Sequence, residues 1–326
     1  MQPAKRVRTE AITSNTIYFI CDDEKNITNF IIPTGVHKIR LKPLRASCTS
    51  FTSVVLPDTL TDIGPRSFDC CEDLKSLTLP TGLTIIGYFA FHRCRSLTSI
   101  VFPDTLTRIG SDAFAECTGL TYLKFPNEIS IGASAFRSCY GLTSIVLPNS
   151  LINVSNGLFL QCTGITNITL PDTLKTIGAN SFAACTGLTS IRLPDMLIAV
   201  ERAAFKNCTQ LTFVSLPHTL THFGNNCFAY CTGLGPNSVV FRPPVGRASF
   251  TAWAVSNMRN RDNYEITTVK RLRNIIRLIT EFSLTCRNID EATMDPDGNN
   301  RAFGEIDYPQ PHEYTIKNGE MYFYYE

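Results

Sequence analysis

The chain repeats one short segment eight times at an almost constant interval. Prolines recur every 23 residues, with one step of 22, and a cysteine follows each proline after thirteen or fourteen residues. Repeat periods of roughly 20–50 residues are typical of solenoids, in which each unit buries its apolar side against a neighbour. The interval therefore predicts one elongated stack. The prolines are Pro57, Pro80, Pro103, Pro126, Pro148, Pro171, Pro194 and Pro217, and the cysteines are Cys71, Cys94, Cys117, Cys139, Cys162, Cys185, Cys208 and Cys231.

One unit shows how the repeat is expected to fold. Ile100 and Phe102 alternate with an outward residue, which predicts a short strand with one face in the core. Pro103 ends that strand because it has no N–H to give to a ladder. Phe114 and Cys117 are three residues apart and fit one tight helical turn that presents both to the interior. Parallel stacking of such units places equivalent residues about 4.8 Å apart.

Three columns of the repeat are explained by folding alone. The phenylalanine column predicts an aromatic core, and the cysteine column predicts small buried side chains, not disulfides or metal ligands. The glycine column predicts a need for backbone freedom, although Ser155 and Glu201 replace glycine in two units. The phenylalanines are Phe68, Phe91, Phe114, Phe136, Phe159, Phe182, Phe205 and Phe228, and the glycines are Gly64, Gly87, Gly110, Gly132, Gly178 and Gly224.

The unit Leu-x-x-Ile-x-Leu-Pro-x-x-Leu-x-x-Ile-Gly-x-x-x-Phe-x-x-Cys-x-x-Leu resembles the BspA-like class of leucine-rich repeats over about residues 27–241. Residues 188–211 match in most columns and depart at Val200-Glu201, where the family usually has Ile-Gly. The resemblance implies a right-handed parallel solenoid. It also implies protein binding, including surface adhesion in microbes, and no catalysis by the repeats.

The whole chain is expected to be an α/β repeat protein, a leucine-rich-repeat solenoid with a C-terminal helical cap. Apolar residues at helical spacing, among them Val269, Leu272, Ile276 and Ile279, predict that cap. Four parts are expected: 1–26, a basic segment with a possible capping strand; 27–241, the solenoid; 242–288, the helical cap; and 289–326, an acidic tail with a possible terminal strand.

No catalytic, cofactor or metal site is expected. His218, His222, Cys227 and Cys231 superficially resemble a zinc site, but the repeat explains their positions and sends them to different sides. The five histidines of the chain fall in unrelated repeat positions or in the tail. We therefore expect a protein that is not an enzyme.

The outward strand positions are where a binding protein would show its partner site. Most of them are small and neutral, but Tyr122 with Lys124 and Arg192 with Phe213 protrude. Aromatic and basic side chains are favoured anchors of interfaces, so these four are the candidate protein-binding residues. Ordinary surface variation is the alternative.

A second candidate surface is the basic face formed by Lys270, Arg273 and Arg277. The segment around it carries excess positive charge, whereas the tail after Arg287 is acidic. The tail is therefore a candidate to fold over the basic face and mask it. A solvated helix face is the alternative.

The composition and the basic N-terminal residues limit which partners and which cellular location are expected. A net charge of +2 argues against nucleic acid as a partner, and no apolar run has the ~18 residues of a membrane span. Thirteen cysteines without a secretory signal favour a reducing compartment. We expect a monomeric, cytoplasmic or nuclear scaffold with an unknown protein partner. The alternatives are an exported microbial surface adhesin and, less favoured, a nucleic-acid-associated protein that uses the basic helix.

Overall fold

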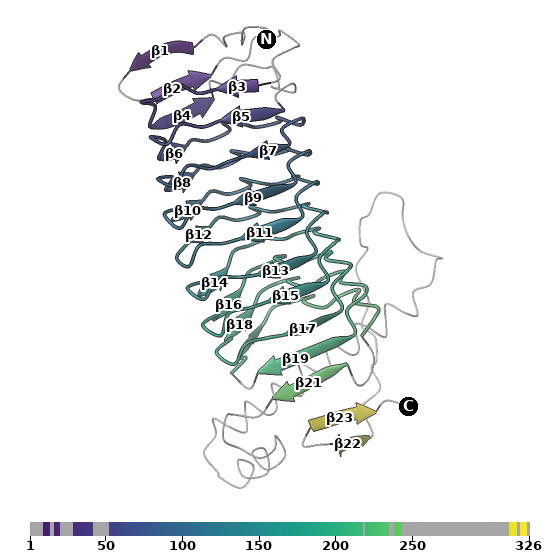
Figure 1. Cartoon of the computed structure of the whole chain (residues 1–326). Helices are drawn as coiled ribbons and strands as arrows, with labels where there is room; N and C mark the ends of the chain where they lie inside the picture. The colour runs from purple at the N-terminus through teal and green to yellow at the C-terminus, as the bar shows by residue number, and fades with distance from the viewer. Residues whose placement is uncertain are drawn as a thin grey trace.

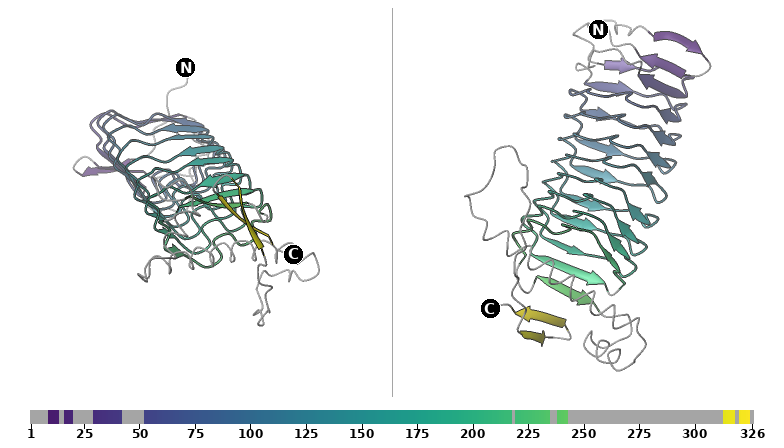
Figure 2. Two further views of the ribbon diagram at one scale, coloured as in Figure 1. Left: turned by 90° about the horizontal axis from the view of Figure 1, so that it is seen from below. Right: turned by 180° about the vertical axis from the view of Figure 1, so that it is seen from behind.

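The chain forms a parallel β-solenoid, which confirms the architecture expected from the repeat (Figure 1). The computed structural model describes residues 9–13, 16–19, 29–41, 52–217, 219–234, 238–242, 313–317 and 320–324. Most coils give one strand to a front row and one to a back row, and both rows run along the stack (Figures 1 and 2). Among the described residues, strand pairing divides the front row into four short sheets and the back row into two, and we call these rows the front sheet and the back sheet. The predicted helical cap lies outside the described residues except at Arg242.

The front sheet is built from the strand that begins each repeat. Parallel neighbours pair residues that are one repeat apart, as Leu123 does with Ile100 and Ile191 with Val214. The front strands are β3 (Asn29–Ile31), β5 (Ser53–Val55), β7 (Ser76–Leu77), β9 (Ser99–Val101), β11 (Tyr122–Lys124), β13 (Ser144–Val146), β15 (Asn167–Thr169), β17 (Ser190–Arg192), β19 (Phe213–Pro217) and β21 (Val239–Arg242).

The back sheet is built from shorter strands that precede the glycine column. Ile109, for example, lies between Ile86 and Ile131 of the coils on either side. The back strands are β2 (Thr16–Phe19), β4 (Lys38–Leu41), β6 (Asp62–Ile63), β8 (Ile85–Ile86), β10 (Arg108–Ile109), β12 (Ser130–Ile131), β14 (Asn153–Val154), β16 (Thr176–Ile177), β18 (Ala199–Val200) and β20 (His222–Phe223).

The third side of each coil, the turn side, holds the phenylalanine and cysteine columns. The helical turn expected there is wrong: the described residues contain no helix, and two positions per coil have positive φ, such as Asp112 (51°) and Glu116 (61°). Asp112, Phe114 and Glu116 instead donate their backbone N–H groups to carbonyls of the next coil at 2.7–2.9 Å. These bonds between coils, each worth about 0.5–1.5 kcal/mol, offset the left-handed backbone, which costs about 1–2 kcal/mol per residue.

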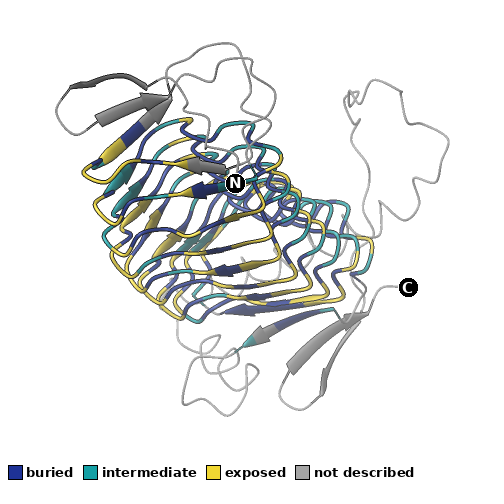
Figure 3. Cartoon of the chain, turned by 45° about the horizontal axis from the view of Figure 1, so that its top comes forward, coloured by how far each residue is buried: buried dark blue, intermediate teal, exposed yellow. Residues whose placement is uncertain are grey.

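The phenylalanine column forms the predicted aromatic core. Its rings stack along the whole solenoid with centroids 5.0–5.8 Å apart, and six of them are completely buried. Figure 3 colours the backbone by burial and shows buried and exposed residues following one another along each coil in the same pattern from coil to coil.

The cysteine column is buried and unpaired, as predicted, but it also makes a hydrogen bond. From Cys94 onward, each thiol lies 3.0–3.3 Å from the backbone carbonyl of the phenylalanine in the preceding coil. Burial raises the pKa of Cys162 to about 12. The column therefore stays protonated and links successive coils through S–H donors.

The glycine column is used for a different reason from the one predicted. The column glycines do not have positive φ; among the described glycines only Gly35 and Gly157 do. A Cβ on Gly110 would lie 2.4 Å from the backbone nitrogen of Tyr88 in the preceding coil. Close approach of two backbones, not backbone freedom, excludes a side chain there.

The single 22-residue step interrupts the back sheet. One residue is missing between Pro126 and Gly132, and within the described chain β12 and β14 are not paired. In the other coils the backbone N–H of the glycine-column residue donates to the preceding coil. Here the hydroxyl of Ser155 donates to the carbonyl of Ile131 instead, at 2.5 Å. This hydrogen bond explains serine at a glycine position.

Short strands lie at both ends of the stack. β1 (Thr9–Thr13) pairs antiparallel with β2, which runs parallel to β4 and precedes the first regular coil. β22 (Glu313–Lys317) and β23 (Glu320–Tyr324) form an antiparallel hairpin, and β23 lies next to β21 (Figures 1 and 2). No helix in the described part of the chain has the length and apolarity to span a membrane.

Candidate interaction surface

Tyr122 and Lys124 both point outward from the front strand β11. Leu123 between them is buried, so the two flanking side chains share the solvent face of the sheet. Tyr122 is 54% exposed. Its neighbours in register are small: Ser99 on the preceding strand lies opposite Tyr122, and Val101 lies opposite Lys124. The tyrosine and the lysine therefore stand above the surface around them.

Arg192 and Phe213 lie diagonally across the adjacent strands β17 and β19. Ser190 is the register partner of Phe213, and Arg192 is the partner of Ser215, so the two candidate side chains are close neighbours on one face. Phe213 is 40% exposed, and the side chain of Arg192 is 72% exposed. Together they form a second aromatic and basic pair.

Arg242 at the end of β21 contacts residues next to this second pair, a role that the sequence did not indicate. Its guanidinium contacts the Asp195 carboxylate at 2.6 Å, Ser215 Oγ at 3.4 Å and the carbonyl of Leu193. Arg192 lies 3.9 Å from the same carboxylate. Burial lowers the pKa of Arg242, while Asp195 opposes that shift. Asp195 thereby contacts one half-buried and one exposed guanidinium close to Phe213.

The surface between the two pairs is small and free of acidic groups. β13 and β15 contribute Ser144, Val146, Asn167 and Thr169 to it. Three strand steps separate β11 from β17, which at ~4.8 Å per step is about 14 Å. No Asp or Glu stands at the outward positions of β5 to β19. We call this surface, from β11 to β19, the front shelf.

A polar network on the turn side was missed by sequence reasoning. Nδ1 of His92 lies 2.8 Å from Oδ1 of Asp69, and its Nε2 lies 3.6 Å from Oε1 of Glu116. The thiol of Cys70 lies 3.3 Å from the same Asp69 oxygen. Hydrogen bonds from His92 and Cys70 lower the pKa of Asp69 against the opposing effect of burial, which is the largest single contribution. Asp69 and His92 are 23 residues apart, so alignment of the units could have shown them side by side.

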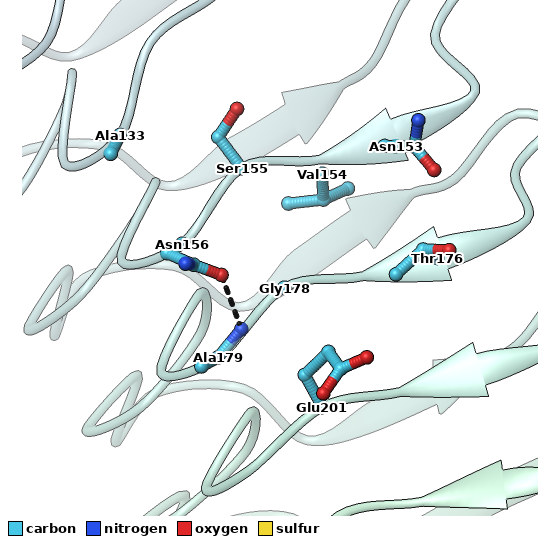
Figure 4. Close-up of a pocket in the computed structure, with 9 residues that line it drawn as sticks. All are labelled: Ala133, Asn153, Val154, Ser155, Asn156, Thr176, Gly178, Ala179 and Glu201. Atoms are coloured by element: carbon cyan, nitrogen blue, oxygen red, sulfur yellow. Dashed lines mark hydrogen bonds between the residues drawn. The ribbon is translucent and has the colours of Figure 1, made fainter.

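A shallow depression of about 530 Å³ lies where the back sheet is interrupted (Figure 4). Asn153, Ser155, Asn156 and Glu201 line it together with small residues. Oδ1 of Asn156 accepts a hydrogen bond of 2.8 Å from the backbone of Ala179. Its lining residues hold amides, hydroxyls and one carboxylate.

Two groups of predicted residues have different outcomes. His222 lies 3.6 Å from Glu201, whereas Cys227 is buried and donates to backbone carbonyls, so these residues do not converge on one ligand position. His218 lies outside the described residues. So does the proposed basic face of Lys270, Arg273 and Arg277, which stays a prediction.

The chain is similar to known leucine-rich repeat proteins in sequence and in structure. The family model described as "BspA type Leucine rich repeat region (6 copies)" matches residues 15–139 and 129–236, which together cover more than half of the chain. Among solved structures, a leucine-rich repeat protein from Bacteroides ovatus is 30% identical with a TM-score of 0.61. The match covers 66% of this chain, which spans only 55% of the length of that protein. No curated protein matches.

Two further structures are more distant. The T. pallidum Leucine Rich Repeat protein is 24% identical with a TM-score of 0.45, over 80% of this chain and 96% of that one. A leucine rich cell surface protein from Faecalibacterium prausnitzii is 22% identical with a TM-score of 0.39, over 77% of this chain and 88% of that one.

Stacked parallel coils with this repeat define the leucine-rich-repeat solenoids, a class of scaffolds that generally bind proteins and are typically not enzymes. Within that class, the chain belongs to the BspA type leucine-rich repeat family. The expected location is corrected by a structural neighbour. One solved neighbour, the Faecalibacterium prausnitzii protein, is described as a cell surface protein, which contradicts the prediction of a cytoplasmic or nuclear protein.

Proposed function

We propose that the chain is a non-enzymatic scaffold that binds a protein partner on the front shelf. Its anchors are Tyr122, Lys124, Arg192 and Phe213. The observation that carries the proposal is the pair of aromatic and basic protrusions on a sheet face that is otherwise small and neutral. Tyrosine, phenylalanine and arginine are enriched in the cores of interfaces, where a few residues supply most of the binding energy.

The charge of the shelf indicates the chemistry of the partner. Lys124 and Arg192 are exposed, and the carboxylate beside Arg192, that of Asp195, is shared with Arg242, so positive charge exceeds negative charge on the shelf. Complementary charge speeds association and suppresses wrong partners, so the contacting segment of the partner is expected to be acidic. An extended segment at ~3.3 Å per residue needs about four residues to bridge the two pairs.

Replacement of the two aromatic anchors by serine tests this proposal. Serine is the commonest residue of their column, so Tyr122→Ser and Phe213→Ser should leave the coil intact. The matched control is Tyr140→Ser, because Tyr140 is 48% exposed outside the front strands. Wild-type protein, the double variant and the control are each crosslinked to proteins of the source cells, and the captured proteins are compared.

A partner held by the wild type and the control but lost from the double variant is the expected result. Equal capture by all three proteins would exclude the front shelf as the binding surface. Reversal of charge at Lys124 and Arg192 to glutamate should then slow association with the identified partner, and added salt should no longer slow that association further. Unchanged association kinetics would exclude an acidic contact.

A second candidate function is adhesion at a microbial cell surface through the same shelf. Membership of the BspA type family favours it. Brief protease treatment of intact cells checks the location. A lower amount of full-length protein in treated cells than in untreated cells supports surface display. Full protection, with digestion only after lysis, would exclude it and leave the binding proposal standing.

A further inference from the structure

Two adjacent coils bring three metal-binding side chains together on the turn side. Asp69 and Cys70 follow Phe68, and His92 follows Phe91 one repeat later. Parallel stacking sets the second coil directly beside the first, so His92 reaches Asp69. One donor atom from each of Asp69, Cys70 and His92 lies within 4.8 Å of the other two, and all three residues are half-buried.

We propose that Asp69, Cys70 and His92 form a binding site for a divalent transition metal of the zinc type. A carboxylate, a thiolate and an imidazole are ligands that zinc takes, and three protein ligands leave one position for water or a group of a partner. Tetrahedral coordination at usual bond lengths separates such donors by about 3.4–3.6 Å. The donors at 2.8 and 3.3 Å therefore need to part by less than about 1 Å.

Glu116 from the third coil completes the arrangement as a positioning residue. Its Oε1 lies 3.6 Å from Nε2 of His92, on the opposite side of the ring from Asp69. Metal binding at Nδ1 would release the proton that Nδ1 gives to Asp69, and a carboxylate beside Nε2 favours the remaining ring proton there, as in other carboxylate–histidine–metal arrangements. Arg93 holds Glu116 in place with a contact of 2.9 Å.

The neighbouring arginines contact the carboxylates of this network, and Arg93 also interacts with the thiol of Cys70, a contact that a bound metal ion would replace. Arg66 contacts Oδ2 of Asp69 at 2.8 Å, so Oδ1 remains directed at His92 and Cys70. Arg137 lies 3.5 Å from Glu116, and Arg93 also contacts that residue. The positive charges are thus paired with carboxylates of the same network.

The same two positions carry no such set of donors in the other repeats. They hold Arg137-Ser138, Leu160-Gln161, Ala183-Ala184, Lys206-Asn207 and Ala229-Tyr230. Folding alone accepts any of these residues, so the fold does not require the donors at Asp69, Cys70 and His92.

Titration with Co²⁺ in a phosphine-reduced buffer tests the site, because a thiolate ligand gives Co²⁺ a sulfur-to-metal charge-transfer absorption. The full chain is expected to show that absorption at one equivalent and to lose it when Zn²⁺ is added. Cys70→Ser should abolish it, and His92→Gln should weaken binding at least about tenfold. Glu116→Gln should weaken binding about 10–100-fold without abolishing it.

His222→Gln is the matched control, since His222 also lies beside a glutamate, Glu201, but has no thiol in its cluster of contacts. Its titration should equal that of the wild type, and circular dichroism of each variant reports whether it is folded. Absence of charge transfer in the wild type, or an unchanged titration for Cys70→Ser, overturns the proposal. The network would then be a set of hydrogen bonds between coils and no metal site.

Discussion

Truncation of one ring in the aromatic column should measure how strongly the coils hold one another. Phe136 is fully buried and stacks between Phe114 and Phe159 at 5.4 and 5.7 Å. Phe102 and Phe125 also meet it edge-on at 6.5 and 5.6 Å. Phe136→Ala removes a whole core ring, which costs about 3–5 kcal/mol, and each aromatic pair contributes about 0.5–1.5 kcal/mol of its own. We expect Phe136→Ala to lower the free energy of unfolding by about 4–5 kcal/mol.

Phe182→Ala is the matched comparison for this measurement. Phe182 is equally buried and stacks between Phe159 and Phe205, and no edge-on ring meets it among the described residues. Its loss should cost about 1 kcal/mol less than that of Phe136. Urea unfolding followed by circular dichroism, with linear extrapolation, gives both free energies. A cost below ~1 kcal/mol for Phe136→Ala would show that the column is not the core.

Three further predictions concern the thiols, the left-handed turns and the close backbone contacts. Burial raises the pKa of Cys162 from its ordinary 9.0 to about 12, so its contribution to stability is complete below pH 9 and falls by about 1.4 kcal/mol per pH unit above it. In Cys162→Ala the free energy of unfolding should therefore fall less steeply with pH than in the wild type, by that amount. Equal slopes for the two proteins in urea unfolding at pH 9–11 would contradict this. Ala184→Gly should stabilise the protein by about 0.5 kcal/mol, because Ala184 has a φ of +57°, whereas Ala183→Gly should destabilise it. The melting temperatures of the two variants should therefore shift in opposite directions. Gly110→Ala should cost more than about 2 kcal/mol because its Cβ meets backbone, whereas Gly82→Ala, with its nearest atom at 3.7 Å, should be tolerated; equal stabilities would refute close approach.

The register of the solenoid was predictable because every coil obeys the same physical requirement. A buried Phe114 or Cys117 has equivalents one period away, so sequence spacing alone places them in one column. The reason for glycine was not predictable in the same way. Spacing shows that Gly110 recurs, but only the backbone of the neighbouring coil shows what a side chain there would meet.

The candidate surface was predictable in part. Alternation along a strand correctly placed Tyr122 and Phe213 on the exposed side, since inward and outward residues alternate. The support of Arg192 by Asp195 and Arg242 was not, because Arg242 belongs to an irregular last coil and contacts Leu193 across 49 positions. The repeat offers no period from which such a contact follows.

The interrupted back sheet gives the solenoid a preferred place to bend. Between β12 and β14 the strand hydrogen bonds are missing, yet on the turn side Ser134 and Phe136 still donate to the next coil at 2.9 and 3.0 Å. One edge of the stack is thus tied while the opposite edge is held by the hydroxyl of Ser155. The front strands β11 and β13 are not paired either, so bending at this step would break fewer strand hydrogen bonds than at the other described steps, and a partner that contacts both β11 and β17 would join the two blocks of coils.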